Sequence, residues 1–146
     1  MVPLCGWTLV GGVVAIIYHF LFSFASNRND VHNFRKLRIY EASMSLCREV
    51  YSLTACFPKY ERYGLSDQLR RCSVSVPSNI AEGCSRTSRK DVARFVTIAL
   101  GSAYEVETQL VLANDFGYAN TDMYTVRVRE LQSQLLAFRN SLLGRA

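Results

Sequence analysis

The chain has 146 residues, of which 49% are hydrophobic and 20% charged. This size and composition indicate one globular domain with a real core and exclude a miniprotein that depends on disulfides. The net charge of +5 favours an anionic partner such as nucleic acid or a membrane surface, although basic proteins without such partners also occur. The five cysteines are odd in number and lack C-x-x-C spacing, which indicates reduced, mostly buried thiols.

Residues 1–30 differ in character from the rest of the chain. Residues 5–26 contain no Asp, Glu, Lys or Arg, and a membrane span needs ~20 such residues. One interpretation is therefore an inner-membrane anchor with a cytoplasmic domain, because basic residues follow the apolar run. A signal peptide fits less well because no Lys or Arg precedes the run. We favour a third interpretation, in which translation begins at Val31 and the protein is cytoplasmic. In every case the predicted folded domain is 31–146.

The first helix is predicted from Phe34 to Phe57. Its apolar residues recur at spacings of three and four, which places them on one helix face. The predicted core-facing seam consists of Leu37, Tyr40, Met44, Cys47, Tyr51 and Thr54, widened by Leu46, Val50 and Leu53. Pro58 ends this helix, because the residue before a proline avoids the α region. Residues 59–64 are a connector.

The second helix is predicted to open at Ser66, a residue type suited to the N-cap. A proline in a helix interior costs ~3 kcal/mol when unsupported. The apolar spacing nevertheless continues in phase across Pro77, which predicts a kink instead of an end. The seam residues are Leu69, Cys72, Val76 and Ile80. Gly83 is expected to end or loosen the helix.

Two further helices follow. Ser88 and Asp91 have the spacing of a capping box, so a third helix begins there. Its seam is predicted to be Val92, Phe95, Ala99, Ser102, Val106, Gln109 and Ala113, and the small residues Ala99, Gly101, Ser102 and Ala103 predict a close helix neighbour. Residues 114–120 form a turn around Gly117. The fourth helix begins near Thr121 or Asp122, ends at Gly144, and has the seam Tyr124, Val128, Leu131, Leu135, Phe138 and Leu142.

No strand-like alternation of useful length occurs, and the connections are short. Sequential helices should therefore be antiparallel neighbours, which predicts an all-α, up-down-up-down four-helix bundle. Some apolar positions lie outside a single seam, and a monomer would expose them unless a wide bundle face absorbs them. These surplus positions are Leu46, Leu53, Val96, Ile98, Met123, Val126 and Leu136. Packing between copies in a ring-shaped homo-oligomer would cover them.

Several short motifs match those of a known family. They are Leu53-Thr54, Phe57-Pro58, Glu61, Tyr63-Gly64-Leu65, Gln68-Leu69-Arg70-Arg71, Ser75 to Gly83, Arg86, Phe95, Gly101-Ser102 and Glu105 to Leu110. From about Phe34 to Leu143 the chain resembles the four-helix-bundle proteins first noticed as reading frames inside intervening sequences of bacterial 23S ribosomal RNA genes. The resemblance implies a bundle, a homopentameric ring and no established enzymatic activity. A related group of retroelement accessory proteins binds nucleic acid and a reverse transcriptase.

Basic residues near the two ends of the predicted second helix are candidates for contact with RNA or DNA. They are Arg70, Arg71, Arg86, Arg89, Lys90 and Arg94. Lys and Arg can neutralise phosphates without reading sequence. The alternative is a solvated face with ion pairs to Glu82, Asp91 and Glu105. Arg86, Arg89 and Lys90 are the better candidates, because backbone donors also point outward at a helix entrance. Aromatic residues are not interleaved with them as they are in single-strand binders.

A second constellation is polar and lies at helical spacing on the second and third helices. Its members are Ser75, Asn79, Glu82, Ser102, Glu105 and Gln109. One interpretation is a pocket with a carboxylate pair. The favoured interpretation is an interhelical hydrogen-bond network that fixes the helix register and serves backbone groups freed by Pro77.

The residues disfavour an enzyme. The only histidines, His19 and His32, precede the first helix, so a di-iron or triad-type site lacks its usual groups. No P-loop and no G-x-G-x-x-G is present, and no cofactor or metal is expected. We therefore expect an oligomeric scaffold or accessory protein that binds nucleic acid. The alternative is a protein–protein interaction module, whose partner is encoded nearby and which is membrane-anchored only if residues 1–30 are retained.

Overall fold

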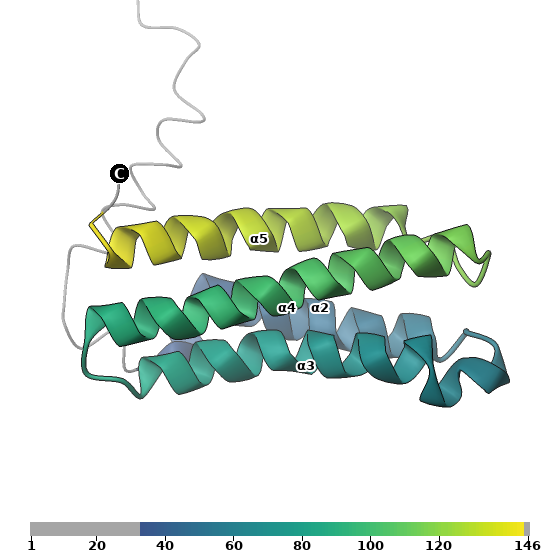
Figure 1. Ribbon diagram of the computed structural model, residues 1–146, viewed down its shortest axis with the longest axis horizontal. Coiled ribbons are helices and arrows are strands. Elements are labelled where there is room, and N and C mark those ends of the chain that lie inside the picture. Colours follow the sequence, from purple (N-terminus) through teal and green to yellow (C-terminus); the bar gives the residue numbers. More distant parts are fainter. Residues whose placement is uncertain (1–32, 145–146) are drawn as a thin grey trace, which may run out of the picture. The chain divides into compact units, whose positions relative to one another are not determined.

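Four long helices, joined by short connections, make up the part of the chain that the computed structural model describes, residues 33–144 (Figure 1). In chain order the elements are the 3-10 helix η1 (Phe34–Lys36), α2 (Arg38–Thr54), the 3-10 helix η2 (Lys59–Tyr63), α3 (Leu65–Cys84), α4 (Arg89–Asp115) and α5 (Asp122–Leu142). The predicted all-α, up-down-up-down bundle is confirmed. The predictions for residues 1–30 and for a start at Val31 lie outside the described residues.

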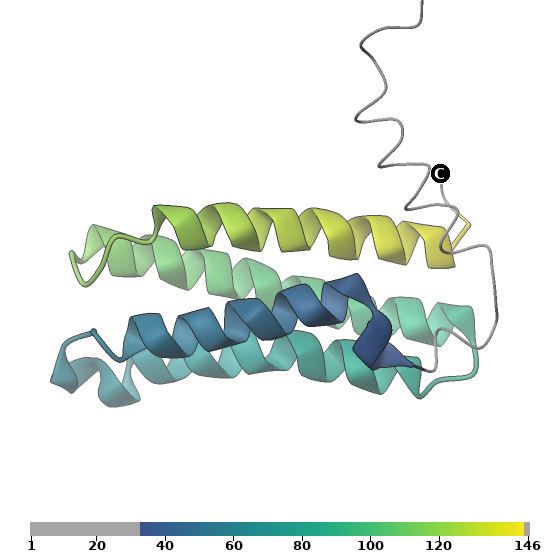
Figure 2. The same cartoon turned by 180° about the vertical axis from the view of Figure 1, so that it is seen from behind.

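Each helix packs against the helices next to it around the bundle. α3 lies between α2 and α4, and α5 contacts both α4 and α2. α2 and α4 make no direct contact, so they occupy diagonal positions, and the two views show them on opposite sides (Figures 1 and 2). Among the described helices, none combines the length and apolar character that a membrane crossing requires.

The core is formed by apolar side chains that recur along each helix and meet at the bundle axis. Its most buried large side chains are Leu69, Ile80, Leu110, Leu135, Val50, Val76, Val96, Val106 and Val128. The predicted seam of α3 is buried throughout. The predicted seams of α4 and α5 are buried except at Phe95 and Tyr124, which are half-buried. Burial of a leucine or valine stabilises the fold by about 1.5–3 kcal/mol, so these rows account for the pairing of the helices.

The predicted seam of α2 is wrong. The buried residues of this helix are Ile39, Ser43, Leu46, Val50, Leu53 and Thr54. Of the predicted seam only Thr54 is buried, whereas the others are half-buried or exposed. α2 therefore carries two apolar stripes, and the core takes the stripe that was expected only to widen the seam. The outer stripe, defined here as Leu37, Tyr40, Met44, Cys47 and Tyr51, flanks the bundle instead.

The start of α3 also differs from the prediction. Gly64 occupies the N-cap, and Ser66 is the second residue of the helix and is buried. The Glu61 carboxylate of η2 accepts a hydrogen bond from the Leu65 amide (Oε2 to N, 2.8 Å) and so satisfies a free donor at the helix start. The helix continues through Pro77 to Cys84.

The capping box of α4 is confirmed, because the Ser88 hydroxyl accepts a hydrogen bond from the Asp91 amide at 3.0 Å. Gly83 stays within α3, and a Cβ placed there would lie 2.9 Å from the Cβ of Phe95. The close approach predicted for α4 holds for Ala99 and Ala103, which are fully buried. Gly101, in contrast, faces open space.

The turn after α4 forms where it was predicted, and Gly117 adopts a positive φ of 70° there, which costs glycine no strain. The surplus apolar positions divide into two groups. Leu46, Leu53 and Val96 are buried in the core of the bundle. The other surplus positions are exposed, namely Ile98, Met123, Val126 and Leu136.

Candidate nucleic-acid interface

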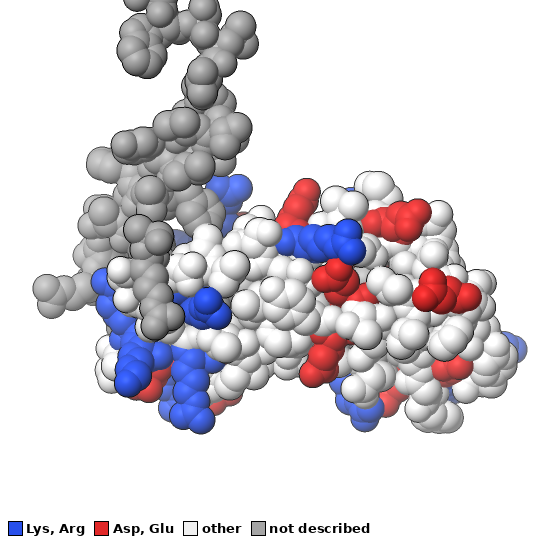
Figure 3. All heavy atoms as spheres, turned by 45° about the horizontal axis from the view of Figure 1, so that its top comes forward, with Lys and Arg blue, Asp and Glu red and all other residues white. Residues whose placement is uncertain are grey.

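One end of the bundle gathers most of the net positive charge. The antiparallel topology brings together the start of α2, the end of α3, the start of α4 and the end of α5. We call this the basic end and define it by its cations, Arg35, Lys36, Arg38, Arg86, Arg89, Lys90, Arg94 and Arg139. Its carboxylates are Glu41, Glu82 and Asp91. Figure 3 shows blue side chains gathered at this end, where α4 begins.

The rest of the described bundle is close to neutral. It carries seven cations against eight carboxylates, whereas the basic end carries eight against three. The positive charge is therefore concentrated and not spread over a solvated face. A cluster of one sign raises the local concentration of oppositely charged partners.

Two arginines of the basic end are held in place by the protein. The Arg86 guanidinium donates to the Glu82 carboxylate at 2.7 Å and lies over the ring of Phe95, 4.7 Å from its centroid. Arg89 donates to the backbone carbonyl of Ser141 at 2.7 Å, which ties the start of α4 to the end of α5. Both side chains keep exposed surface.

Four further cations of the basic end are exposed, and one of them, Arg35, lies over the ring of Phe34. Arg35, Lys36, Lys90 and Arg94 are exposed, and no ion pair links them to a carboxylate of the described residues. Lys90 lies in the first turn of α4, where the helix dipole also favours anions, and Arg94 lies in the second turn. These four side chains can therefore neutralise phosphates without first breaking an ion pair.

The structure does not bring Arg70 and Arg71 into this cluster. They lie near the start of α3, about 14 residues and therefore ~21 Å from its far end. Arg71 pairs with Asp67 at 3.2 Å. Arg70 donates from Nε to the Thr54 hydroxyl at 2.7 Å, and its guanidinium lies 5.3 Å from the centroid of the Tyr51 ring. Both arginines thus have partners within the bundle.

Sequence reasoning missed four members of the basic end, Arg35, Lys36, Arg38 and Arg139, as phosphate contacts. They belong to segments far from the α3–α4 turn in sequence. The signal was present, since an up-down-up-down bundle places alternate helix ends together. Arg139 carries a buried Nε without a hydrogen-bond acceptor in the described residues, while its terminal nitrogen donates to Asn140.

The predicted polar constellation separates into three parts. The first joins α3 to α4, because the Ser75 and Ser102 hydroxyls lie 2.8 Å apart and Asn79 donates to the Ser75 hydroxyl at 3.0 Å. Asn79 also donates to the Ser75 carbonyl at 2.8 Å, one turn before it in the helix. Glu82 lies apart from this group, exposed and paired with Arg86.

The third part contains Glu105 and Gln109 together with Cys72, which was not predicted to belong to the constellation. The Cys72 thiol donates to the Glu105 carboxylate at 2.9 Å and accepts from the Gln109 amide at 3.4 Å. Burial, followed by the hydrogen bond to Glu105, raises the pKa of Cys72 to about 11. A thiol in this state is protonated at neutral pH and a poor nucleophile, so the contact serves as an interhelical brace.

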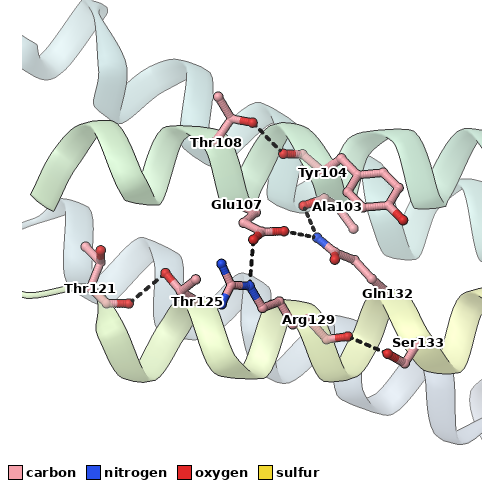
Figure 4. A network of polar contacts seen from close by, with 9 residues as sticks. All are labelled: Ala103, Tyr104, Glu107, Thr108, Thr121, Thr125, Arg129, Gln132 and Ser133. Carbon is pink, nitrogen blue, oxygen red and sulfur yellow. Dashed lines mark hydrogen bonds and ion pairs between the residues drawn. The ribbon is translucent and has the colours of Figure 1, made fainter. Parts of the chain in front are cut away.

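A further brace, unpredicted from the sequence, links α4 to α5 (Figure 4). The Glu107 carboxylate accepts from Arg129 Nε and from Gln132 Nε2, both at 2.7 Å. Gln132 Nε2 also approaches the Ala103 carbonyl at 3.4 Å. The hydrogen bonds from Gln132 and Arg129 lower the pKa of Glu107.

A groove of about 480 Å³ runs between α2 and α5. Its lining mixes apolar residues such as Leu46 and Leu131 with an ion pair between Glu49 and Arg127. The charged residues of the groove are two carboxylates and one arginine, whereas the basic end carries eight cations against three carboxylates. Within residues 33–144 no group of His, Cys, Asp and Glu side chains is placed to hold a metal ion.

Comparison with known proteins gives one family and one fold. A family model described as 23S rRNA-intervening sequence protein matches residues 35–137. A crystal structure of a protein of unknown function from the S23 ribosomal protein family of Bacteroides thetaiotaomicron is similar, with a TM-score of 0.61 and 22% identity. The match covers 69% of this chain and 97% of that chain. No curated protein matches the sequence.

Proposed function

The chain belongs to the 23S rRNA-intervening sequence protein family, and we propose that it is a non-enzymatic, oligomeric scaffold that binds nucleic acid through its basic end. The observation that carries the proposal is the concentration of eight cations at one end of a bundle that is otherwise close to neutral. Phosphate contacts from Lys and Arg supply most of the affinity in sequence-independent binding.

The proposal is tested by binding to RNA and DNA across a salt series. We expect affinity to fall steeply as salt rises, because each neutralised phosphate releases counterions. Lys36→Glu combined with Lys90→Glu should weaken binding at least tenfold. Lys59→Glu, an exposed lysine at the opposite end, is the matched control and should change affinity little. Binding that is absent at low salt or insensitive to salt would leave the interaction module without nucleic acid as the better account.

The scaffold part of the proposal comes from half-buried and exposed apolar side chains outside the core. The outer stripe of α2 repeats at spacings of three and four, as in helices that pack against a partner helix. α4, on the diagonal, exposes Ile98, Tyr104, Val111 and Leu112. Two different apolar faces on opposite sides favour a heterologous contact between copies, which can close into a ring.

Light scattering with absorbance at 260 nm on protein purified from cells tests both parts at once. We expect the mass of a multimer, and co-purified nucleic acid that high salt removes. Ile98→Glu combined with Tyr104→Glu should reduce the mass while helix content stays constant. Ser133→Glu on α5, an exposed position outside both faces, is the control. A monomeric mass for the unmodified chain would refute the scaffold.

A further inference from the structure

The aromatic rings at the basic end are already occupied. Phe34 packs edge-on against Tyr40, with centroids 4.9 Å apart, and the Arg35 guanidinium lies over it at 4.7 Å. Arg86 covers Phe95 at the same distance. The fourth ring, Phe138, is buried in the core. Each ring of this end, within the described residues, is therefore either buried or already in contact with a ring or a guanidinium, and none is largely exposed.

The exposed rings lie at the other end of the bundle. Tyr63, Tyr60 and Phe116 are 85%, 74% and 58% exposed, and they belong to η2 and to the turn after α4. A helix of about 20 residues separates the two ends by ~30 Å. Proteins that bind single strands combine a cationic track with stacking rings in one site. Here the eight clustered cations and the most exposed rings are on separate surfaces, and only Lys59 and Arg62 of η2 lie beside the rings, with Arg62 over Tyr63.

The shape of the basic end favours a duplex. Its cations come from four helix ends spread over a face and not from one track along a groove. Neighbouring helices lie about 8–10 Å apart, so the face is roughly 20 Å across. Double-stranded DNA carries one charge per ~1.7 Å of axis, so such a face spans a length of duplex that carries about a dozen phosphates on its two backbones, of which one side faces the protein.

We infer that the ligand of the basic end is base-paired nucleic acid, held by the phosphates of both strands and without sequence readout. This inference rests on the proposed function and specifies its ligand. A base-paired backbone presents phosphates at fixed spacing and needs no stacking rings. The four exposed cations without ion pairs, Arg35, Lys36, Lys90 and Arg94, supply the contacts that cost least to form.

The test measures fluorescence anisotropy of the full chain with duplex RNA and duplex DNA of about 20 base pairs, and with oligouridine of equal length. We expect the duplexes to bind at least tenfold more tightly than oligouridine at equal salt. If the four cations are engaged, the slope of log K against log salt should lie near −3 to −4. Equal or tighter binding of oligouridine would overturn the inference.

Two double variants distinguish failure of this inference from failure of the proposed function on which it rests. Lys90→Glu combined with Arg94→Glu, both exposed, should weaken duplex binding at least tenfold with unchanged helix content. Tyr60→Ala combined with Tyr63→Ala, at the far end, should leave it unchanged. Loss of binding in the tyrosine variant would place the ligand on the stacking surface and refute the inference. If the unmodified chain binds neither form, the proposed function itself fails; if it prefers single strands through Lys90 and Arg94, only the duplex assignment fails.

Discussion

Some charged side chains lie partly buried between neighbouring helices and hold these helices together through hydrogen bonds. Glu107 is the clearest case, because Gln132 and Arg129 both donate to its carboxylate across the α4–α5 boundary. Its lowered pKa means that the folded state favours the ionised form. Such a group stabilises the fold above its unfolded pKa and ceases to do so as pH falls through the folded value.

Glu107→Gln should therefore lower the free energy of unfolding at neutral pH by about 1 kcal/mol, since Arg129 is largely exposed and water screens the pair. The difference from the unmodified chain should shrink as pH falls below about 4, where the carboxylate of the unfolded chain protonates. Urea unfolding at neutral pH and below about pH 4 measures this difference in the free energy of unfolding. Glu130→Gln, an exposed carboxylate on α5, is the control. A difference that grew in acid would contradict the assignment.

We expect the described cysteines to differ in reactivity, because burial changes the pKa of a thiol. The four described cysteines are free thiols, with Cys56 exposed and Cys72 and Cys84 buried. Burial raises the pKa of Cys72 and of Cys84 to about 11. Since only the thiolate reacts, iodoacetamide at pH 8 should modify Cys56 first and spare both buried thiols. Peptide mass spectrometry measures the order, and unfolding in urea should abolish it. Labelling of Cys72 as fast as Cys56 would show that the brace to Glu105 is open.

At the scale of the helices, two glycines of similar sequence context have opposite roles. Gly83 lies where α3 touches α4, and a Cβ there would meet the Cβ of Phe95, which cannot move aside without shifting its backbone. Gly101 is in the middle of α4 with open space around its Cα. Gly83 is thus required by packing, whereas Gly101 only adds chain entropy to the unfolded state.

Alanine at the two positions should change stability with opposite signs. Gly83→Ala should destabilise the bundle by about 1–3 kcal/mol through overpacking. In the Ile98→Glu, Tyr104→Glu background, where no second copy covers this part of α4, Gly101→Ala should stabilise it by about 0.5–1 kcal/mol. Thermal and urea unfolding of each variant, compared with the chain into which the alanine was introduced, measures the two changes in stability. A stabilising Gly83→Ala would show that α3 and α4 are not in close contact there.

How far the sequence predicts an element depends on how many faces of it are apolar. α4 and α5 each carry one dominant seam, so their registers and the Ser88 cap followed from spacing alone. α2 carries two stripes that fit the same period, and periodicity cannot choose between them. The start of α3 was missed because its cap comes from Glu61, a side chain of the preceding connector. Contacts with other elements, and not the local sequence pattern, determine which stripe of α2 is buried and where α3 begins.

The whole molecule is a bundle with its charge at one end. The residues of the α3–α4 turn could be found from the sequence because they are neighbours in the chain. Arg35, Lys36 and Arg139 join them only once the helices are antiparallel, so their role required the topology as well as the composition. The ion pair of Arg71 and the hydrogen bond of Arg70 to Thr54 depend on side-chain geometry, which no spacing rule contains.

Like charges at one end repel one another, so the candidate interface should cost stability. Lys90→Gln combined with Lys36→Gln is expected to raise the free energy of unfolding by a few tenths of a kcal/mol at low salt. The gain should vanish near 1 M salt, where the screening length falls to ~3 Å. Urea unfolding at the two salt concentrations measures it. Lys59→Gln at the other end is the control and should give no such gain. A loss of stability at low salt in the double variant would contradict the prediction, because it would mean that Lys36 and Lys90 have stabilising partners.

Separation of the charge along the helices also gives the bundle a permanent electric moment directed toward the basic end. A polyanion then exerts a torque on the approaching molecule and turns that end toward itself before contact. Association should accordingly be fast and fall steeply with ionic strength, while dissociation, set by the contacts once made, changes less. Rapid-mixing kinetics would therefore detect the asymmetry of the bundle in its on-rate.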